Sequence, residues 1–319
     1  MKTAIDPFIV RMNALPISPE TRKSYTYKVC SAMKACKCPT FEEMVMSPDE
    51  SMKLLENKYA KVSTLKQTLT AVLATLSSDK EWCKKNRDCQ QSWKEYHAKL
   101  AKKAGEVNQH PKSMDADQID KTYACWSKIE RASMRASRNP DKHITLESSM
   151  QTVFLSMITQ MPPKRSDFGS LAVKDMEYDG TIKNHIKVSG TKPVVLVIGE
   201  HKTSKSHGEL KEECSRKLTN VIRESLRKWP REYLFTTKRG HAMSSNAYGN
   251  FVKKTMTTHL GKSIGTTMIR HIFISDVVAH LESKKDKKNI ADRMLHSVAE
   301  QKRYIITKMD GQDICERVK

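Results

Sequence analysis

The sequence predicts a mainly α-helical protein of two domains, with one small antiparallel β-sheet in the second domain. At 319 residues the chain is long enough for two domains that each bury a hydrophobic core. Apolar residues recur at helical spacing through most of it, as in the aliphatic stripe of residues 63–76. The pattern changes at 185–188 and 194–198, which are rich in Val and Ile and are separated by Gly190 and Pro193. Two short strands joined by turn residues favour an antiparallel hairpin.

The first domain is expected to span residues 1–110 and to be helical. Ser18 and Ser47 each stand before a proline, which places a capping hydroxyl next to a residue favoured in the first helical turn. The boundary is placed within 105–117, where glycine, asparagine and proline cluster. The second domain then covers residues 111–319.

In the sequence of the second domain, helices are predicted both before and after the strands. A helix at 116–134 and a strongly apolar one at 146–160 precede the strands, and a short third strand is expected at residues 208–210. Helical patterns then resume at 212–228, 244–259, 265–282, 287–294 and 297–306.

The charge balance points to a polyanionic partner. Lys and Arg number 57 against 36 Asp and Glu, a net charge of +21, which is typical of proteins that bind nucleic acid. Charge alone leaves open a basic protein that binds RNA or anionic lipid without specificity. No apolar stretch approaches 18 residues and the first residues do not resemble a signal peptide, so we expect an intracellular protein, neither secreted nor in a membrane.

The eight cysteines favour reduced thiols over a disulfide framework. Cys36 and Cys38, and the pair Cys83 and Cys89, suggest zinc at first sight. Their spacings fit no common zinc module, however, and no pair of histidines stands nearby at helical spacing. The sequence therefore predicts no metal site.

One set of residues supplies the parts needed to break and rejoin a phosphodiester through a tyrosyl ester. A phenol can act as the nucleophile, guanidinium groups match the phosphate oxygens, and a general acid can protonate the departing 5′ oxygen. These parts occur in the order Arg165, Lys202, Arg270, His296 and Tyr304.

Each residue of this set also has an ordinary structural interpretation. Arg165 follows Pro162 and Pro163, which should end the apolar helix and expose the next side chains, but it could belong to a solvated basic corner. Arg270 is flanked by apolar residues and needs an anionic partner, which a salt bridge would also provide.

The remaining members are equally ambiguous when taken singly. Lys202 follows a predicted strand and could be the proton donor, and Lys205 could take that role instead. His296 precedes Ser297, a probable helix cap, and Tyr304 could simply pack. Only the joint order of all the residues favours catalysis.

In this order of motifs the chain resembles the tyrosine recombinases, the family of phage integrases, over nearly its whole length. The runs PPKR at 162–165, KTSK at 202–205 and RHIFIS at 270–275 look most similar to integrases of large eukaryotic DNA viruses and virophages. The resemblance implies the two-domain architecture of that family. Residues 1–110 would form a helical core-binding domain that clamps DNA, and 111–319 an α+β catalytic domain with a C-terminal nucleophile and a short tail.

The resemblance also implies a role for each matched residue. Arg165 and Arg270 correspond to the two clamp arginines, Lys202 to the general acid, His296 to the histidine of the Gly-His-Ser-type turn and Tyr304 to the nucleophile. Supporting or DNA-binding roles are expected for Lys164, Thr203, Lys205, Thr267 and His271.

Two positions depart from the family pattern, and one neighbour adds to it. Thr267 stands where the family commonly has His or Lys, so proton transfer would depend more on Lys202 and His296. Leu295 stands where many members have glycine, which could alter the turn. Asp167 is expected to orient Arg165.

The resemblance implies a site-specific DNA recombinase or integrase of a mobile element or virus that acts through a 3′-phosphotyrosyl intermediate. The tyrosyl ester conserves the bond energy, so no cofactor is expected. The partner would be double-stranded DNA, bound as a homotetramer on two duplexes, in the host nucleus or at a viral replication site. The rival functions are a type IB topoisomerase, a catalytically silent DNA-binding protein on the same fold, and a basic RNA-binding module.

Overall fold

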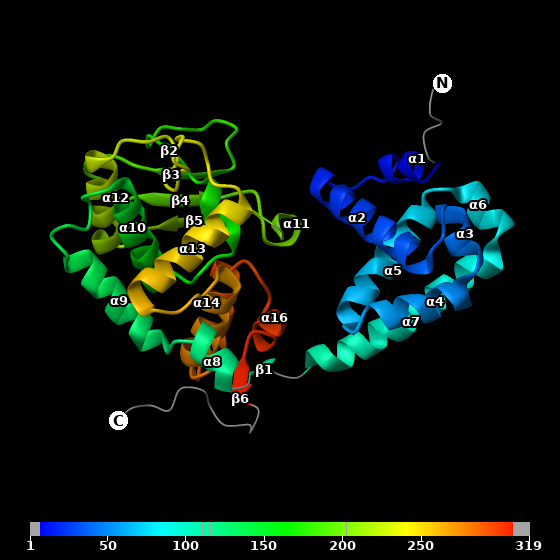
Figure 1. Ribbon diagram of the computed structural model, residues 1–319. Coiled ribbons are helices and arrows are strands. Elements are labelled where there is room, and N and C mark those ends of the chain that lie inside the picture. Colours follow the sequence, from blue (N-terminus) through cyan, green and yellow to red (C-terminus); the bar gives the residue numbers. More distant parts are fainter. Residues whose placement is uncertain (1–6, 110–111, 115, 202, 309–319) are drawn as a thin grey trace. The chain divides into compact units, whose positions relative to one another are not determined.

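The computed structural model describes residues 7–109, 112–114, 116–201 and 203–308. The chain forms two compact units, Met1–His110 and Pro111–Lys319 (Figure 1). The prediction of a mainly helical chain with one small sheet is confirmed, although the pairing within the sheet differs from the expectation.

The first unit is built from helices around an aliphatic and aromatic core. The predicted cap at Ser18 is present, because its hydroxyl accepts a hydrogen bond from the Thr21 N–H over 3.2 Å. Trp93 is fully buried and donates from its indole to the carbonyl of Val45 over 3.0 Å. The helices are α1 (Pro7–Asn13), α2 (Pro19–Cys36), α3 (Phe41–Met46), α4 (Pro48–Lys58), α5 (Val62–Ser77), α6 (Lys80–Lys85) and α7 (Arg87–Gln109).

The second unit surrounds one apolar helix, α10 (Leu146–Gln160). All residues from 149 to 158 of α10 are buried, because α9 (Trp126–Arg138) and α12 (Arg216–Lys228) cover the helix. Its start is fixed by a capping box between Thr145 and Ser148. The other helical segments are α8 (Ala116–Thr122), η1 (Ser166–Ser170), α11 (Ser204–His207), α13 (Ser245–Leu260), α14 (Thr266–Phe273), the π-helical turn η2 (Ile274–Val278), α15 (Lys284–Arg293) and α16 (Val298–Lys302).

The sheet of the second unit is mixed rather than antiparallel. Its order is β2 (Ala172–Lys174), β3 (Asn184–Lys187), β4 (Val195–Ile198) and β5 (Leu210–Glu213). The expected hairpin is present as antiparallel β3 and β4, and β5 continues it antiparallel to β4. The sheet differs from the expectation in β2, which pairs parallel to β3, because the connection between the two strands returns the chain to the end at which β2 began. Three residues of β2 are too few to show a strand pattern in the sequence.

A second sheet joins the two ends of this unit. Strand β1 (Lys112–Met114) pairs in parallel with β6 (Ile306–Lys308), so residues almost 200 positions apart are side by side (Figure 1). The predicted helix at 297–306 is therefore wrong in its second half, because α16 ends at Lys302 and Ile306 already belongs to β6.

The predicted helix at 116–134 is also divided. Asp276 accepts a hydrogen bond from the backbone N–H of Trp126 over 2.7 Å and another from the Tyr123 hydroxyl. The carboxylate thereby accepts a hydrogen bond from an N–H group at the start of α9 that has no partner within the helix. It also fixes η2 to the segment between α8 and α9.

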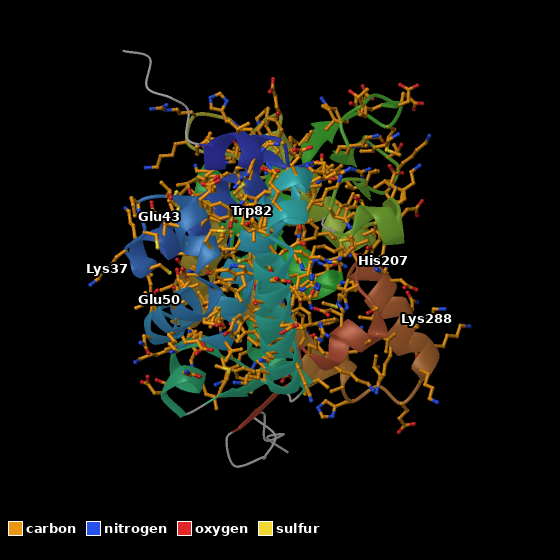
Figure 2. The ribbon with its side chains drawn as sticks, turned by 90° about the vertical axis from the view of Figure 1, so that its right-hand side faces the viewer. Lys37, Glu43, Glu50, Trp82, His207 and Lys288 are labelled. Atoms are coloured by element: carbon orange, nitrogen blue, oxygen red, sulfur yellow. The ribbon has the colours of Figure 1, made fainter. Side chains whose placement is uncertain are left out.

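The cysteines are mostly free, as expected. Among the cysteines that the structure describes, six are free thiols and Cys125 is disulfide-bonded, so the expectation of reduced thiols does not hold at Cys125. Within the described ranges, the helices that are long enough to cross a bilayer are too polar to do so. Exposed lysines extend from the surface of the second unit, as Lys288 does from α15 (Figure 2).

Candidate active site

Three side chains that can carry positive charge surround the phenol of Tyr304. The Nη2 group of Arg165 donates a hydrogen bond to the Tyr304 hydroxyl oxygen over 3.3 Å. The guanidinium carbon of Arg270 lies 4.9 Å from the centroid of the Tyr304 ring. The His296 ring stacks on that ring, with centroids 5.7 Å apart and planes inclined by 29°. The structure thus brings together four of the five residues expected to carry the chemistry.

Arg165 reaches Tyr304 because of how α10 ends. The helix stops at Gln160, and Pro162 and Pro163 cannot continue it, since proline lacks the N–H that a further turn requires. The chain then turns into η1, and Arg165 is left half-buried at the start of that turn. The expected end of the helix is confirmed, but the expected exposure of the next side chains is wrong, because Lys164 is buried and Arg165 is half-buried.

Arg270 lies inside the fold rather than on it. Arg270 is 1% exposed. It lies on α14, where Ile269, Ile272 and Phe273 are also buried. A guanidinium above an aromatic face in such surroundings gains electrostatic attraction from the ring. The burial holds the positive charge at a constant position against the Tyr304 ring.

The run 270–275 also holds the backbone at Tyr304 and just after it. His271 donates from Nδ1 to the Tyr304 carbonyl over 2.6 Å, because a carbonyl can only accept. Ser275 accepts a hydrogen bond on its hydroxyl from the Ile306 N–H over 2.9 Å. Ser275 was not among the predicted site residues, although it closes the RHIFIS motif. The π-helical turn places it, a feature frequent at functional sites.

His296 is positioned by the turn that ends α15. Leu295 has φ +57°, the left-handed conformation that glycine favours, and it donates to the carbonyl of Asp292 over 3.0 Å. The next N–H, of His296, returns to the carbonyl of Ala291 over 3.1 Å. The glycine-type turn is therefore kept with leucine in it, because burial of the Leu295 side chain offsets the backbone cost.

His296 is neutral at pH 7 and presents one ring nitrogen as an acceptor. Burial lowers its pKa to about 4, and the charges of Arg270 and Arg165 act in the same direction. Nδ1 carries the proton, because it donates to the Ser297 carbonyl over 3.1 Å. Nε2 is buried and has no hydrogen-bond partner among the described residues. It can therefore accept a proton or a hydrogen bond from a bound group.

The segment expected to supply the general acid lies next to this turn. Lys202 falls outside the described residues, as does the side chain of Lys205, so the choice between the two lysines stays open. Thr203, between them, donates from its hydroxyl to the carbonyl of Leu295 over 2.9 Å. His201 Nε2 lies 2.8 Å from the Gly208 carbonyl and closes the loop from the other side.

The supporting residues divide into two groups. His271 contacts the Tyr304 backbone, whereas Thr267 is exposed on the first turn of α14. Lys164 is not part of a solvated corner, because its ammonium is buried and donates to the Glu212 carboxylate over 3.3 Å and to the Arg293 carbonyl. The sequence did not predict a role for Glu212 or Arg293, since nothing in the neighbouring sequence distinguishes them from charged residues on the surface. The side chain of Asp167 is outside the described part.

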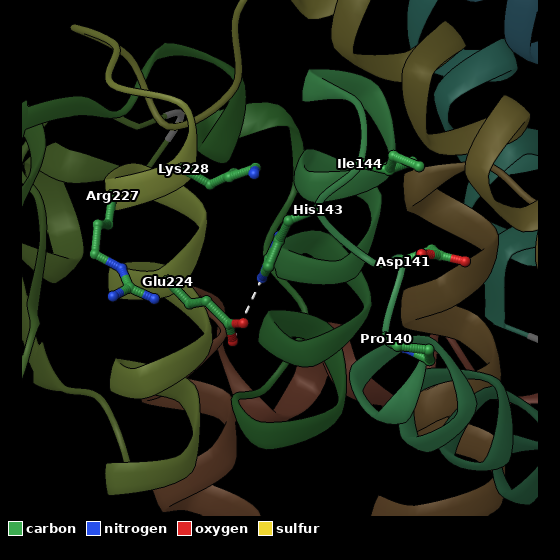
Figure 3. Close-up of a pocket in the computed structure, with 7 residues that line it drawn as sticks. All are labelled: Pro140, Asp141, His143, Ile144, Glu224, Arg227 and Lys228. Atoms are coloured by element: carbon green, nitrogen blue, oxygen red, sulfur yellow. Dashed lines mark ion pairs between the residues drawn. The ribbon is translucent and has the colours of Figure 1, made fainter.

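A separate cavity of about 560 Å³ contains another histidine (Figure 3). His143 Nε2 lies 3.5 Å from the Glu224 carboxylate, and its Nδ1 lies 2.9 Å from the Ser149 hydroxyl. Ser149 is fully buried, so this Ser-His-Glu row cannot attack a substrate and anchors the loop before α10. Among the described residues, no group of three His, Cys, Asp or Glu side chains could hold a metal ion.

Comparisons with known proteins give only weak similarity. No family model and no curated protein matches the sequence. Two similar solved structures are a XerA recombinase, with a TM-score of 0.38 and 12% identity, and a lambda integrase(75-356) dimer bound to a COC′ core site, with 0.48 and 11%. The XerA alignment covers 93% of this chain and 90% of that chain, and the integrase alignment 93% of both. At these TM-scores the functional argument rests on the geometry around Tyr304.

Proposed function

We propose that this protein is a site-specific DNA recombinase or integrase that cleaves and rejoins DNA through a 3′-phosphotyrosyl bond to Tyr304. The observation that carries the proposal is the convergence of Arg165, Arg270 and His296 on one phenol, all from the second unit. Single basic residues are common on a protein with this charge. A tyrosine enclosed by two guanidinium groups and a neutral histidine is not explained by packing alone.

The proposed reaction follows from these positions. The Tyr304 oxygen attacks the phosphorus, the bond to the 5′ oxygen breaks, and the departing oxygen takes a proton. Arg165, already 3.3 Å from the phenol oxygen, would contact the phosphate beside it, and Arg270 would add a fixed positive charge beneath. His296 Nε2 would accept the proton that the phenol loses. Lys202 or Lys205 would donate the proton to the 5′ oxygen.

The proposed partner is double-stranded DNA. With a net charge of +21, phosphate contacts would dominate binding and make it steeply salt-dependent. Residues 1–110 would grip the duplex and 111–319 would carry out the cleavage. By resemblance, the active assembly would be a homotetramer on two duplexes, acting for a mobile element or virus in the host nucleus or at a viral replication site.

The test is covalent trapping on duplexes that carry the end sequences of the mobile element and a 5′-bridging phosphorothiolate. The sulfur leaving group departs without a general acid, so the adduct accumulates. A denaturing gel should show a protein–DNA adduct with wild type and with Tyr27→Phe, whose tyrosine is 76% exposed in the first unit, but not with Tyr304→Phe.

The outcomes separate the rival functions. Absence of any adduct with wild type would overturn the proposal and favour a silent DNA-binding protein. Relaxation of supercoiled plasmid without a site requirement would instead indicate a type IB topoisomerase. Equal affinity for RNA and duplex DNA would point to a basic RNA-binding module.

A further inference from the structure

Glu212, on β5, lies at the centre of a buried ionic cluster. Its side chain is 12% exposed and accepts a bond from the Lys164 ammonium over 3.3 Å. Arg293 donates to the other carboxylate oxygen, from Nε over 3.0 Å and from Nη2. Lys164 also donates to the backbone carbonyl of Arg293, which closes the ring of contacts.

The cluster joins three segments that each lead to the candidate active site. Lys164 is the residue before Arg165, and Arg293 is three residues before His296. Glu212 lies on the strand that follows the 202–205 segment. Glu212 is 48 positions from Lys164 and 81 positions from Arg293 in the chain, so no local interaction could bring the three residues together.

The backbone at the end of α15 explains why this cluster bears on His296. The last carbonyls of a helix have no partner within it, and a positive charge there is favoured by the helix dipole. Lys164 bonds the carbonyl of Arg293, and Thr203 bonds the carbonyl of Leu295. The turn that presents His296 is thus held from two sides by residues adjacent to Arg165 and Lys202.

We propose that Glu212 is a positioning residue for DNA cleavage, which holds Lys164 and Arg293 so that Arg165 and His296 face Tyr304. The inference rests on the proposed function and adds a residue that has no contact with Tyr304 itself. Among the described residues, Glu212 is the one carboxylate that forms an ion pair with Lys164, and the ammonium is otherwise next to positive charge from Arg293 and Arg270.

Loss of that carboxylate has a defined consequence. Burial lowers the pKa of Lys164 to about 8 even with Glu212 present, and Glu212 opposes this change. In Glu212→Gln, Lys164 loses its counter-ion and either loses its proton or moves toward solvent. Both changes weaken the bond to the Arg293 carbonyl and free the Arg165 corner and the His296 turn to shift.

The kinetic test compares Glu212→Gln with Glu213→Gln, the exposed neighbour on the same strand. We expect Glu212→Gln to slow single-turnover adduct formation by about 10- to 100-fold, the range for a displacement of about 1 Å at a reacting group. The DNA dissociation constant should stay within about twofold of wild type, as expected for a residue that binds no phosphate. Glu213→Gln should match wild type in both.

A second readout does not depend on activity. In wild type, the ¹³Cε1 resonance of His296 should show a neutral ring down to about pH 5, whereas in Glu212→Gln the ring should protonate closer to its ordinary pKa of about 6.5. If Glu212→Gln unfolds, Lys164→Met/Glu212→Gln keeps the volume without an unpaired buried charge and takes its place in both assays.

The two proposals fail separately. Wild-type cleavage and wild-type titration of His296 in the Glu212 variants would overturn the positioning role and leave the proposed function intact. Absence of an adduct with wild type would overturn the proposed function, while the His296 titration would still decide whether Glu212 holds the turn.

Discussion

At position 295, substitution by glycine should be less destabilising than substitution by alanine, which is the reverse of the usual order in a helix. The φ of Leu295, +57°, lies in the left-handed region, where a residue with a Cβ atom pays about 1–2 kcal/mol that glycine avoids. Its side chain is also buried, and removal of a buried leucine side chain costs about 2–5 kcal/mol. Leu295→Ala loses the side chain and keeps the backbone cost, whereas Leu295→Gly loses the side chain and removes that cost.

The expected result is that Leu295→Gly is more stable than Leu295→Ala by about 1 kcal/mol, although both are less stable than wild type. Urea unfolding followed by circular dichroism measures the difference. The adjacent Met294 is also buried but has φ −84°. Met294→Ala should therefore be more stable than Met294→Gly by about 0.5–1 kcal/mol. Equal or greater stability of Leu295→Ala over Leu295→Gly would refute the reasoning about the turn.

Three further predictions concern the same site. Because the folded pKa of His296 is about 4 against an ordinary 6.5, the unfolded state binds the extra proton between these values, so stability is lost as pH falls through this window. The loss amounts to about 3 kcal/mol in wild type, and pH-dependent unfolding of His296→Gln should lack it; an unchanged slope would contradict this. Whichever of Lys202→Ala and Lys205→Ala stops cleavage of ordinary DNA, yet recovers with the 5′-phosphorothiolate duplex, identifies the general acid, and recovery by neither would exclude both. Thr203→Val should cost about 1 kcal/mol of stability through the lost bond to the Leu295 carbonyl, whereas Thr203→Ser should retain it, and equal urea midpoints for the two variants would show that the bond has no net value.

The residues around Tyr304 could be predicted because their types and order reflect the chemistry. The sequence predicts that Arg165, Arg270, His296 and Tyr304 share one site, and the structure brings them together. Their catalytic roles stay predictions, as does the role of the lysine. The helices and the β3–β4 hairpin were predictable for a related reason, since apolar periodicity is a local property.

The features that were missed depend on distant segments. Strand β2 has only three residues, and its parallel pairing with β3 is decided by the path of the chain between them. Glu212 is one of two adjacent glutamates, and only burial against Lys164 and Arg293 distinguishes it from Glu213. No periodicity marks a charge whose partners lie 48 and 81 positions away.

The pairing of β6 with β1 limits how far the backbone of Tyr304 can move. Ile306, two residues after Tyr304, is aligned with Lys112 in the β1–β6 ladder. Two extended residues span about 7 Å, so the Cα atom of Tyr304 must stay within about 7 Å of the Cα atom of Ile306 while this ladder is intact. In the proposed reaction, each subunit would therefore cleave the strand bound to its own Arg165 and Arg270. Delivery of Tyr304 to a neighbouring subunit would first require β6 to separate from the strand at the start of its own domain.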